Sequence, residues 1–242
     1  MKVGSLFSGI GGLDLGLERA GHTVVWQSEI DPFCCKVLAK HWPGIPNHGD
    51  ITAIDWGTVE PVDVLCGGFP CQDISLAGTG QGLKGARSGL WFEFARAISI
   101  LRPRYVLIEN VPGLFIRGFY RVLLNLAAIG YDAEWQCLQA AYFGAIHRRR
   151  RVFILAYPHN NGTPPTAHRG CFGTRTPPGE HGTTQEIYHY SGGRGTWQAK
   201  PGMDRVGNGV PDWVDRLGSL GNAVVPQVAE YIGKQIPPHP SG

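Results

Sequence analysis

Long hydrophobic runs and paired cysteines are both missing from this sequence. No apolar run approaches the roughly 18 residues of a membrane span, and no basic-then-apolar leader precedes the first predicted strand, so we expect neither membrane insertion nor secretion. None of the six cysteines belongs to a CxxC pair, which argues against a zinc knuckle and a disulfide framework and favours reduced cytoplasmic thiols. The nine histidines form no credible ligand set, and we therefore predict no metal site.

Charge of either sign is sparse as well. Charged residues make up 17% of the chain and leave a net charge of +3, which permits a polyanionic partner without requiring one. A chain of 242 residues with 43% hydrophobic content is long enough to bury one α/β core, with a small additional lobe.

Short apolar runs alternate with amphipathic stretches along most of the chain. The runs that we interpret as strands are 2–7, 23–28, 62–66, 103–108, 133–138 and 151–156. The stretches that we interpret as helices are 13–21, 33–41, 90–101, 117–129 and 226–235. This order predicts an α/β fold, with a Rossmann-like sheet and helices on both faces. From Pro158 to about Lys200 the sequence has no period, which predicts an irregular insert.

A tight glycine turn follows the third predicted strand and leads to Cys71. The glycines at 67–68 let the backbone turn sharply, and Pro70 stiffens the bond before the cysteine. Cys71 would stand at the carboxyl end of a strand, where open α/β sheets bind their ligands. A thiol there is a candidate nucleophile, although a free core cysteine fits the same pattern. Residues 73–89, rich in Gly, Ser and Lys, suggest a lid beside it.

Another glycine-rich turn follows the first predicted strand. Residues 8–12 read Ser-Gly-Ile-Gly-Gly between a strand and a helix, where bare backbone can approach a nucleotide-type cofactor; a tight connection alone would look the same. Glu29 ends the second strand, where it would bind ribose hydroxyls or cap the helix that opens at Pro32. Asp50 lies in a loop, where it would hold an adenine amine or stabilise its own turn.

Two further strand ends carry charge. Glu109 follows the strand 103–108, ahead of a Pro-Gly turn, and is placed like an active-site acid, although an ordinary loop acid would look the same. The arginine run 148–151 alone would be a solvated basic patch. Because it leads directly into a strand, Arg149 and Arg151 should point to one face and aim two guanidiniums into one site.

Together these motifs resemble those of the DNA (cytosine-5)-methyltransferase family. The matching segments are Phe7-Ser8-Gly9-Ile10-Gly11-Gly12, Glu29, Asp50, Pro70-Cys71-Gln72 with Ser75, Glu109-Asn110-Val111, Arg149 with Arg151, and Gly221-Asn222-Ala223-Val224-Val225-Pro226. They cover about 3–156 and 207–236, in the family's order and spacing. His147 stands where the family has glutamine, and the short recognition region resembles that of compact phage or prophage members.

The resemblance implies an S-adenosylmethionine-dependent methyltransferase with three parts. These are a catalytic domain (1–157), a target-recognition insert (158–206) and a C-terminal segment that returns to the catalytic domain (207–242). The implied catalytic residues are Cys71, Glu109, Arg149 and Arg151. The implied cofactor-binding residues are Phe7, Ser8, Gly9, Ile10, Gly11, Gly12, Glu29, Ile30, Asp50, Ile51, Pro70, Leu90, Asn222, Ala223 and Val224.

The implied reaction moves a methyl group from S-adenosyl-L-methionine to C5 of a flipped-out cytosine in a specific DNA sequence, through a covalent adduct between Cys71 and C6. The implied partners are double-stranded DNA, bound by a monomer, and a cognate restriction endonuclease, in the cytoplasm of a bacterium or phage-infected host. Two alternatives stay open. One is an RNA cytosine-5 methyltransferase of the tRNA-acting branch; the other is a catalytically dead binding module, against which the intact Cys71 and Glu109 argue.

Overall fold

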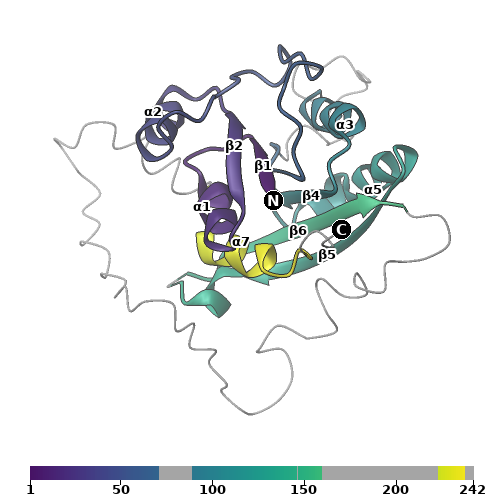
Figure 1. The fold of residues 1–242 in the computed structure, drawn as a ribbon. Coiled ribbons are helices and arrows are strands. Elements are labelled where there is room, and N and C mark those ends of the chain that lie inside the picture. Colours follow the sequence, from purple (N-terminus) through teal and green to yellow (C-terminus); the bar gives the residue numbers. More distant parts are fainter. Residues whose placement is uncertain (71–88, 146, 160–222, 238–242) are drawn as a thin grey trace, which may run out of the picture.

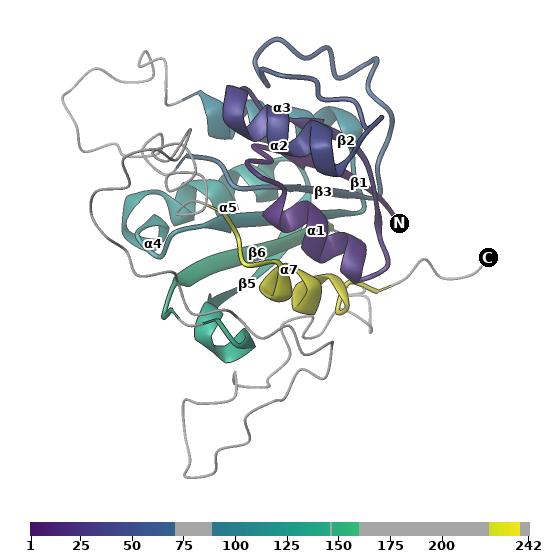
Figure 2. The same ribbon diagram turned by 90° about the vertical axis from the view of Figure 1, so that its left-hand side faces the viewer.

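Six strands form one mixed sheet at the centre of the molecule (Figures 1 and 2). The computed structural model describes residues 1–70, 89–145, 147–159 and 223–237. The strands are β1 (Lys2–Leu6), β2 (Thr23–Ser28), β3 (Val64–Gly67), β4 (Tyr105–Asn110), β5 (Tyr131–Gln139) and β6 (Arg150–Pro158). Their order across the sheet is β2-β1-β3-β4-β6-β5.

The strand directions bring the predicted functional loops to one edge. Strands β1, β2, β3 and β4 pair in parallel, so their carboxyl ends meet at the same edge of the sheet. Strand β6 runs antiparallel to β4 and β5 antiparallel to β6, so the amino end of β6 joins that edge. This arrangement places the segments after β1, β2, β3 and β4 next to the segment before β6.

Helices cover both faces of the sheet, as predicted (Figure 1). The helices are α1 (Gly12–Arg19), α2 (Pro32–His41), α3 (Leu90–Leu101), α4 (Leu114–Arg117), α5 (Phe119–Ala128), the 3₁₀ turn η2 (Ala140–Phe143) and α7 (Pro226–Gly233). One core cluster joins α1 and α7 to the sheet through Leu17 and Ile232, and the other joins α3 and α5 to it through Phe94 and Leu126. The two-faced sheet follows from strands that are apolar on both sides.

Helices α1 and α7 pack against each other so closely that their contact requires small residues (Figure 2). A Cβ at Gly16 would lie 2.4 Å from the Cβ of Ala229 and 2.5 Å from the carbonyl oxygen of Pro226. At Gly12 it would lie 2.4 Å from the carbonyl oxygen of Val224. The last described segment of the chain therefore lies directly beside the first helix.

The helix predicted at 117–129 is confirmed as α5, which begins at Phe119, and a separate short helix, α4, precedes it and was not predicted. One strand prediction needs correction. The strand predicted at 103–108 extends through Asn110, so Glu109 lies inside β4 rather than after it. The predicted lid falls almost entirely on 71–88, and the irregular insert largely on 160–222; both ranges lie outside the described residues.

Candidate active site

The glycine-rich segment after β1 adopts a backbone that few residues tolerate. Gly9 and Gly11 have φ of 55° and 81°, and Phe7 has φ of 52°, all in the left-handed region. Among the described residues, no heavy atom lies within 4 Å of a Cβ built on Gly9, so that part of the structure leaves the backbone there open. This exposed, tightly turned backbone could receive a ligand at close range.

Glu29, at the end of β2, holds that segment with its carboxylate. Oε2 accepts the backbone N–H of Gly9 at 2.7 Å, and Oε1 accepts those of Ile30 and Asp31, each at 2.8 Å. The helix α2 is capped by Asp31, whose Oδ1 accepts the N–H of Cys34 at 2.8 Å, so Glu29 is not its cap. The alternative of Glu29 as a helix cap is therefore wrong.

The remaining predicted cofactor residues after β2 lie in different surroundings. Ile30 is 68% exposed beside Glu29, an unusual position for an isoleucine. Asp50 is exposed, and its Oδ1 accepts both the backbone N–H and the hydroxyl of Thr52. Ile51 is packed in the core. The Asp50 carboxylate thus stabilises its own turn in the structure.

Residues 67–69, which lead to Cys71, pack closely against neighbouring strands. A Cβ at Gly68 would lie 2.6 Å from Oε2 of Glu109, and one at Gly67 would lie 2.7 Å from the carbonyl oxygen of Leu6. The buried Asn110 side chain donates from Nδ2 to the carbonyl oxygen of Phe69 at 3.0 Å. Both glycines are therefore required, one by the neighbouring strand and one by the Glu109 carboxylate.

Glu109 is buried and forms an ion pair with Arg151. Nε of Arg151 lies 2.7 Å from Oε1 of Glu109. Burial raises the pKa of Glu109 above its ordinary value, and the positive charges of Arg151 and Arg149 partly oppose that rise. The pKa of Arg149 is lowered, first by burial and then by the charge of Arg151. The site therefore combines a buried carboxyl of raised pKa with two arginine side chains.

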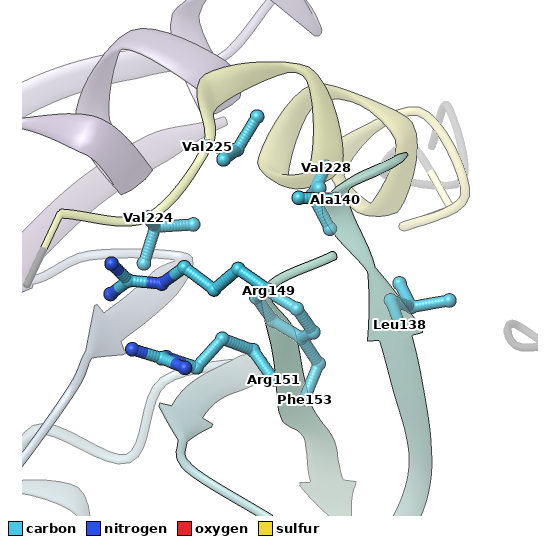
Figure 3. Close-up of a pocket in the computed structure, with 8 residues that line it drawn as sticks. All are labelled: Leu138, Ala140, Arg149, Arg151, Phe153, Val224, Val225 and Val228. Carbon is cyan, nitrogen blue, oxygen red and sulfur yellow. The ribbon is translucent and has the colours of Figure 1, made fainter. Parts of the chain in front are cut away.

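The two arginines extend side by side from the start of β6 (Figure 3). They line a small cavity together with apolar side chains from β5, η2, β6, α7 and the segment before α7 (Figure 3). The apolar lining residues are Leu138, Ala140, Phe153, Val224, Val225 and Val228. The prediction that Arg149 and Arg151 share one face is confirmed, and Val224 lies above the Arg149 side chain (Figure 3).

The structure brings most, but not all, of the predicted site residues to this edge. Ser8 is buried and donates from Oγ to the carbonyl oxygen of Ser5, whereas Pro70 is exposed just before Cys71. Leu90, at the first turn of α3, packs against the core. Ala223 begins the segment that leads through Val224 to α7, and Ile10 is half-buried in the glycine turn. Cys71 and Asn222 lie outside the described residues.

Two groups at this edge were missed by sequence reasoning. Asp14, on α1, is fully buried and accepts hydrogen bonds from Oγ of Ser5 at 2.9 Å and from Nε2 of Gln27 at 2.8 Å. The Asn47 side chain hydrogen-bonds to the backbone of Glu29 and to the backbone of Gly49, next to two predicted cofactor residues. No local pattern identifies either residue, since their partners lie 9 to 18 residues away in the sequence.

The family model for C-5 cytosine-specific DNA methylases matches residues 1–192. The chain belongs to that family. The Type II methyltransferase M2.BsuMI of Bacillus subtilis is 42% identical over 164 residues, and M.NgoBI of Neisseria gonorrhoeae is 37% identical over 163 residues. These alignments cover 64% and 66% of the chain, respectively. The match to the family model confirms the resemblance that the sequence motifs indicated.

The methylase spans about half the length of these relatives, 42% of M2.BsuMI and 51% of M.NgoBI. Among solved structures, the S. pombe Dnmt2 methyltransferase superposes with a TM-score of 0.57 at 22% identity, covering 67% of this chain and 52% of that one. This likeness bears on the fold, which is the predicted Rossmann-like α/β arrangement. Among the described residues, no helix is both long and apolar enough to cross a membrane.

Proposed function

We propose that this methylase transfers a methyl group from S-adenosyl-L-methionine to C5 of cytosine in double-stranded DNA. The observation that carries the proposal is the buried pair of Glu109 and Arg151, directly against the glycine segment that leads to Cys71. The family and its Type II relatives support the reaction class. The same chemistry implies that the target base is flipped out of the duplex, because its reacting atoms are inaccessible inside it.

The proposed chemistry begins with the thiolate of Cys71, because C5 of cytosine is too weakly nucleophilic to take a methyl group unaided. Addition of the thiolate to C6 makes C5 enamine-like, so that C5 can form a bond to the donor's methyl group while S-adenosylhomocysteine leaves. A base would then take the C5 proton, and the electron pair of that C–H bond would expel the cysteine from C6. The fixed backbone from Gly67 to Pro70 supports this role, since it anchors the start of the cysteine loop beside Glu109. Nearby arginines would favour the thiolate.

Glu109 is proposed to donate a hydrogen bond or proton to N3 of the base while electron density moves there. Burial raises the pKa of Glu109, which is the direction that favours proton donation and supports this role. Arg149 is proposed to bind the O2 side and stabilise the developing negative charge, while Arg151 positions Glu109 through their ion pair.

The edge formed by β1 and β2 fits the methyl donor. The open space over Gly9 leaves backbone accessible to a ligand, and Ile30 offers an exposed apolar surface beside Glu29. We propose that these residues hold S-adenosyl-L-methionine, with Glu29 at the ribose and Asp50 at the adenine. The donor would supply an activated methyl group. Phe7, Ser8, Ile10, Gly11 and Gly12 shape the same turn.

The whole enzyme is proposed to act as a monomer on DNA in the cytoplasm of a bacterium or phage-infected host. Residues 158–206 are proposed to supply base contacts, between the catalytic domain (1–157) and the returning segment (207–242). The Type II names of the relatives support a place beside a cognate restriction endonuclease. Phosphate contacts would make DNA binding salt-dependent.

The test is methyl transfer from labelled S-adenosyl-L-methionine to unmethylated duplex DNA, with tRNA in parallel. We expect 5-methylcytosine in DNA from the wild-type protein and none from Cys71→Ala. Cys137→Ala, an exposed cysteine of β5, is the matched control and should retain activity. Transfer to tRNA alone would move the protein to the RNA-acting branch. Donor binding without transfer to either substrate would establish the inactive binding module instead.

A further inference from the structure

Asn47 connects two chain segments that meet at the proposed cofactor edge. Its Oδ1 accepts the backbone N–H of Glu29 at 2.9 Å and that of Gly49 at 3.1 Å. Its Nδ2 donates to the carbonyl oxygen of Glu29 at 3.1 Å and to Sγ of Cys35 at 3.2 Å. One exposed amide therefore binds both backbone polar groups of Glu29 and the backbone immediately before Asp50.

The strand framework around Asn47 does not depend on its side chain. The N–H of Gln27 donates to the carbonyl oxygen of Pro46 at 2.9 Å, and the N–H of His48 donates to that of Gln27 at 2.8 Å. Ser28 Oγ adds a bond to the carbonyl oxygen of Gly49 at 2.7 Å. These bonds hold residues 46–49 beside β2 without the Asn47 side chain. The Asn47 amide therefore acts on Glu29, just beyond the end of β2, and on Gly49.

Those positions are the ones that face a ligand. Glu29 reaches from this end to the N–H of Gly9, so the orientation of its backbone also sets the glycine turn after β1. Movement of the Glu29 backbone would displace Oε2 from Gly9, and release of the Gly49 N–H would displace Asp50. Within the described part of the chain, the Asn47 amide is the side chain that hydrogen-bonds to both segments.

A purely local role would look different. Asn and Asp side chains often accept the N–H two residues on, and the bond from Gly49 is of this kind. The bonds to Glu29 span 18 residues and use the amide nitrogen as well as the oxygen. Only an amide can accept from the N–H and donate to the carbonyl of the same residue in this way.

We infer that Asn47 is a positioning residue for the methyl donor, which fixes the ribose-binding Glu29 and the adenine-binding Asp50 relative to each other. This inference rests on the proposed function, since it assumes that S-adenosyl-L-methionine is the ligand. It assigns no contact between Asn47 and the donor. Its consequence is that Asn47 controls donor affinity while leaving the DNA side of the site untouched.

The experiment compares donor binding by Asn47→Ala and Asn47→Asp in the full-length protein. Calorimetric titration with S-adenosyl-L-methionine should show a Kd raised on the order of tenfold in both variants, since each loses hydrogen bonds that orient the site. Steady-state rates should show a matching rise in KM for the donor, an unchanged kcat and an unchanged KM for DNA. Thermal midpoints should stay within about 2 °C of wild type.

The Asn47→Asp variant distinguishes the proposed link between Glu29 and Gly49 from a purely local turn at Gly49. Aspartate keeps the oxygen that accepts from Gly49 but lacks the amide donor to the Glu29 carbonyl. Wild-type affinity in Asn47→Asp would therefore overturn the inference in favour of a local turn. Asn125→Ala, which removes the partner of Trp91 Nε1 on α5, is the matched control and should lower the midpoint without changing donor affinity.

Other outcomes are equally decisive. Wild-type affinity in Asn47→Ala, or a parallel loss of donor affinity, DNA affinity and thermal stability, would overturn the inference while leaving the proposed function intact. Failure of the wild-type protein to bind S-adenosyl-L-methionine would overturn the proposed function, and the inference with it.

Discussion

At the scale of single residues, Glu109 occupies an environment unlike that of an ordinary surface acid. It is buried, ion-paired with Arg151, and its pKa is raised by burial against the opposing charges of two arginines. As a proposed acid it should lose activity as pH rises through that raised pKa, because the ionised form cannot donate. The carboxyl is thus tuned by the same contacts that hold it in place.

Glu109→Gln should therefore lower kcat by about 10²- to 10⁴-fold, the usual contribution of a general acid, while DNA affinity changes little. Single-turnover methylation across a pH series, with a gel-shift assay alongside, measures both quantities. The variant should also lose the alkaline decline in rate. Glu60→Gln, which removes an exposed partner of Lys2, is the control for the same exchange. Equal losses of rate and DNA affinity would contradict an acid role.

Asp14 is the second buried acid, and its effect belongs to stability. Burial raises its pKa from 3.8 to about 6, against the hydrogen bonds from Gln27 and Ser5. Because the folded pKa is the higher one, the folded state is favoured below pH 4, and this contribution is lost as pH rises to about 6. The shift corresponds to about 3 kcal/mol.

Asp14→Asn should remove that dependence. Between about pH 4 and pH 7 the wild-type protein should lose about 3 kcal/mol of unfolding free energy relative to the variant. Urea unfolding at several pH values measures the difference, and Asp55→Asn, at an exposed position, controls for the exchange itself. Parallel curves for wild type and Asp14→Asn would show that the Asp14 carboxyl does not titrate in this range.

At the scale of secondary-structure elements, the sequence located most helices and strands because their signals are local. Apolar periodicity, glycine stops and Pro32 predicted α1, α2, α3 and the first strands within a few residues. The short helix α4 escaped because four residues are too few to show a helical period. Local signals also gave no reason for Gly16, which depends on a helix more than 200 residues away in the sequence.

Gly16 gives the test of that helix contact. Alanine is favoured over glycine in a helix by about 1 kcal/mol, but its Cβ would collide with Ala229 and with the Pro226 carbonyl. Gly16→Ala should therefore destabilise the protein by about 1–3 kcal/mol, as overpacked substitutions do. Gly89→Ala is the matched control, because its φ of −81° suits alanine and no atom of the described residues lies within 4 Å of the added Cβ. A stabilised Gly16→Ala protein would show that α1 and α7 separate readily.

At the scale of the whole molecule, the candidate site draws on strand ends that lie far apart in the sequence. Parallel pairing of β1, β3 and β4 brings the glycine turns and Glu109 to one edge of the sheet, and the antiparallel β6 begins at that edge beside Arg149. The sequence could not predict the individual contacts within the site. The Glu109–Arg151 ion pair and the hydrogen bonds of Asn47 depend on strand register and side-chain rotamers, not on a local sequence pattern. Neither leaves a periodic signal.

The last described helix, α7, belongs to the same hydrophobic cluster as the first helix, α1. Val228, Ile232 and Ile236 are buried against the sheet and α1, together with Leu13 and Leu17. Burying one such side chain stabilises a protein by about 1.5–3 kcal/mol, so the three residues together approach the 5–15 kcal/mol that holds a typical domain folded. Removal of α7 should therefore unfold the molecule as a whole.

A chain ending at residue 222 should lose its cooperative thermal transition, because the apolar surface of α1 and the sheet that α7 covers is then left open to water. Circular dichroism and differential scanning fluorimetry measure that loss. A synthetic peptide of residues 223–237 should restore the transition in trans, and the same peptide with Ile232→Asp should not, since a carboxylate cannot enter the apolar cluster without a partner. An unchanged melting temperature in the shortened chain would mean that the core is stable without α7.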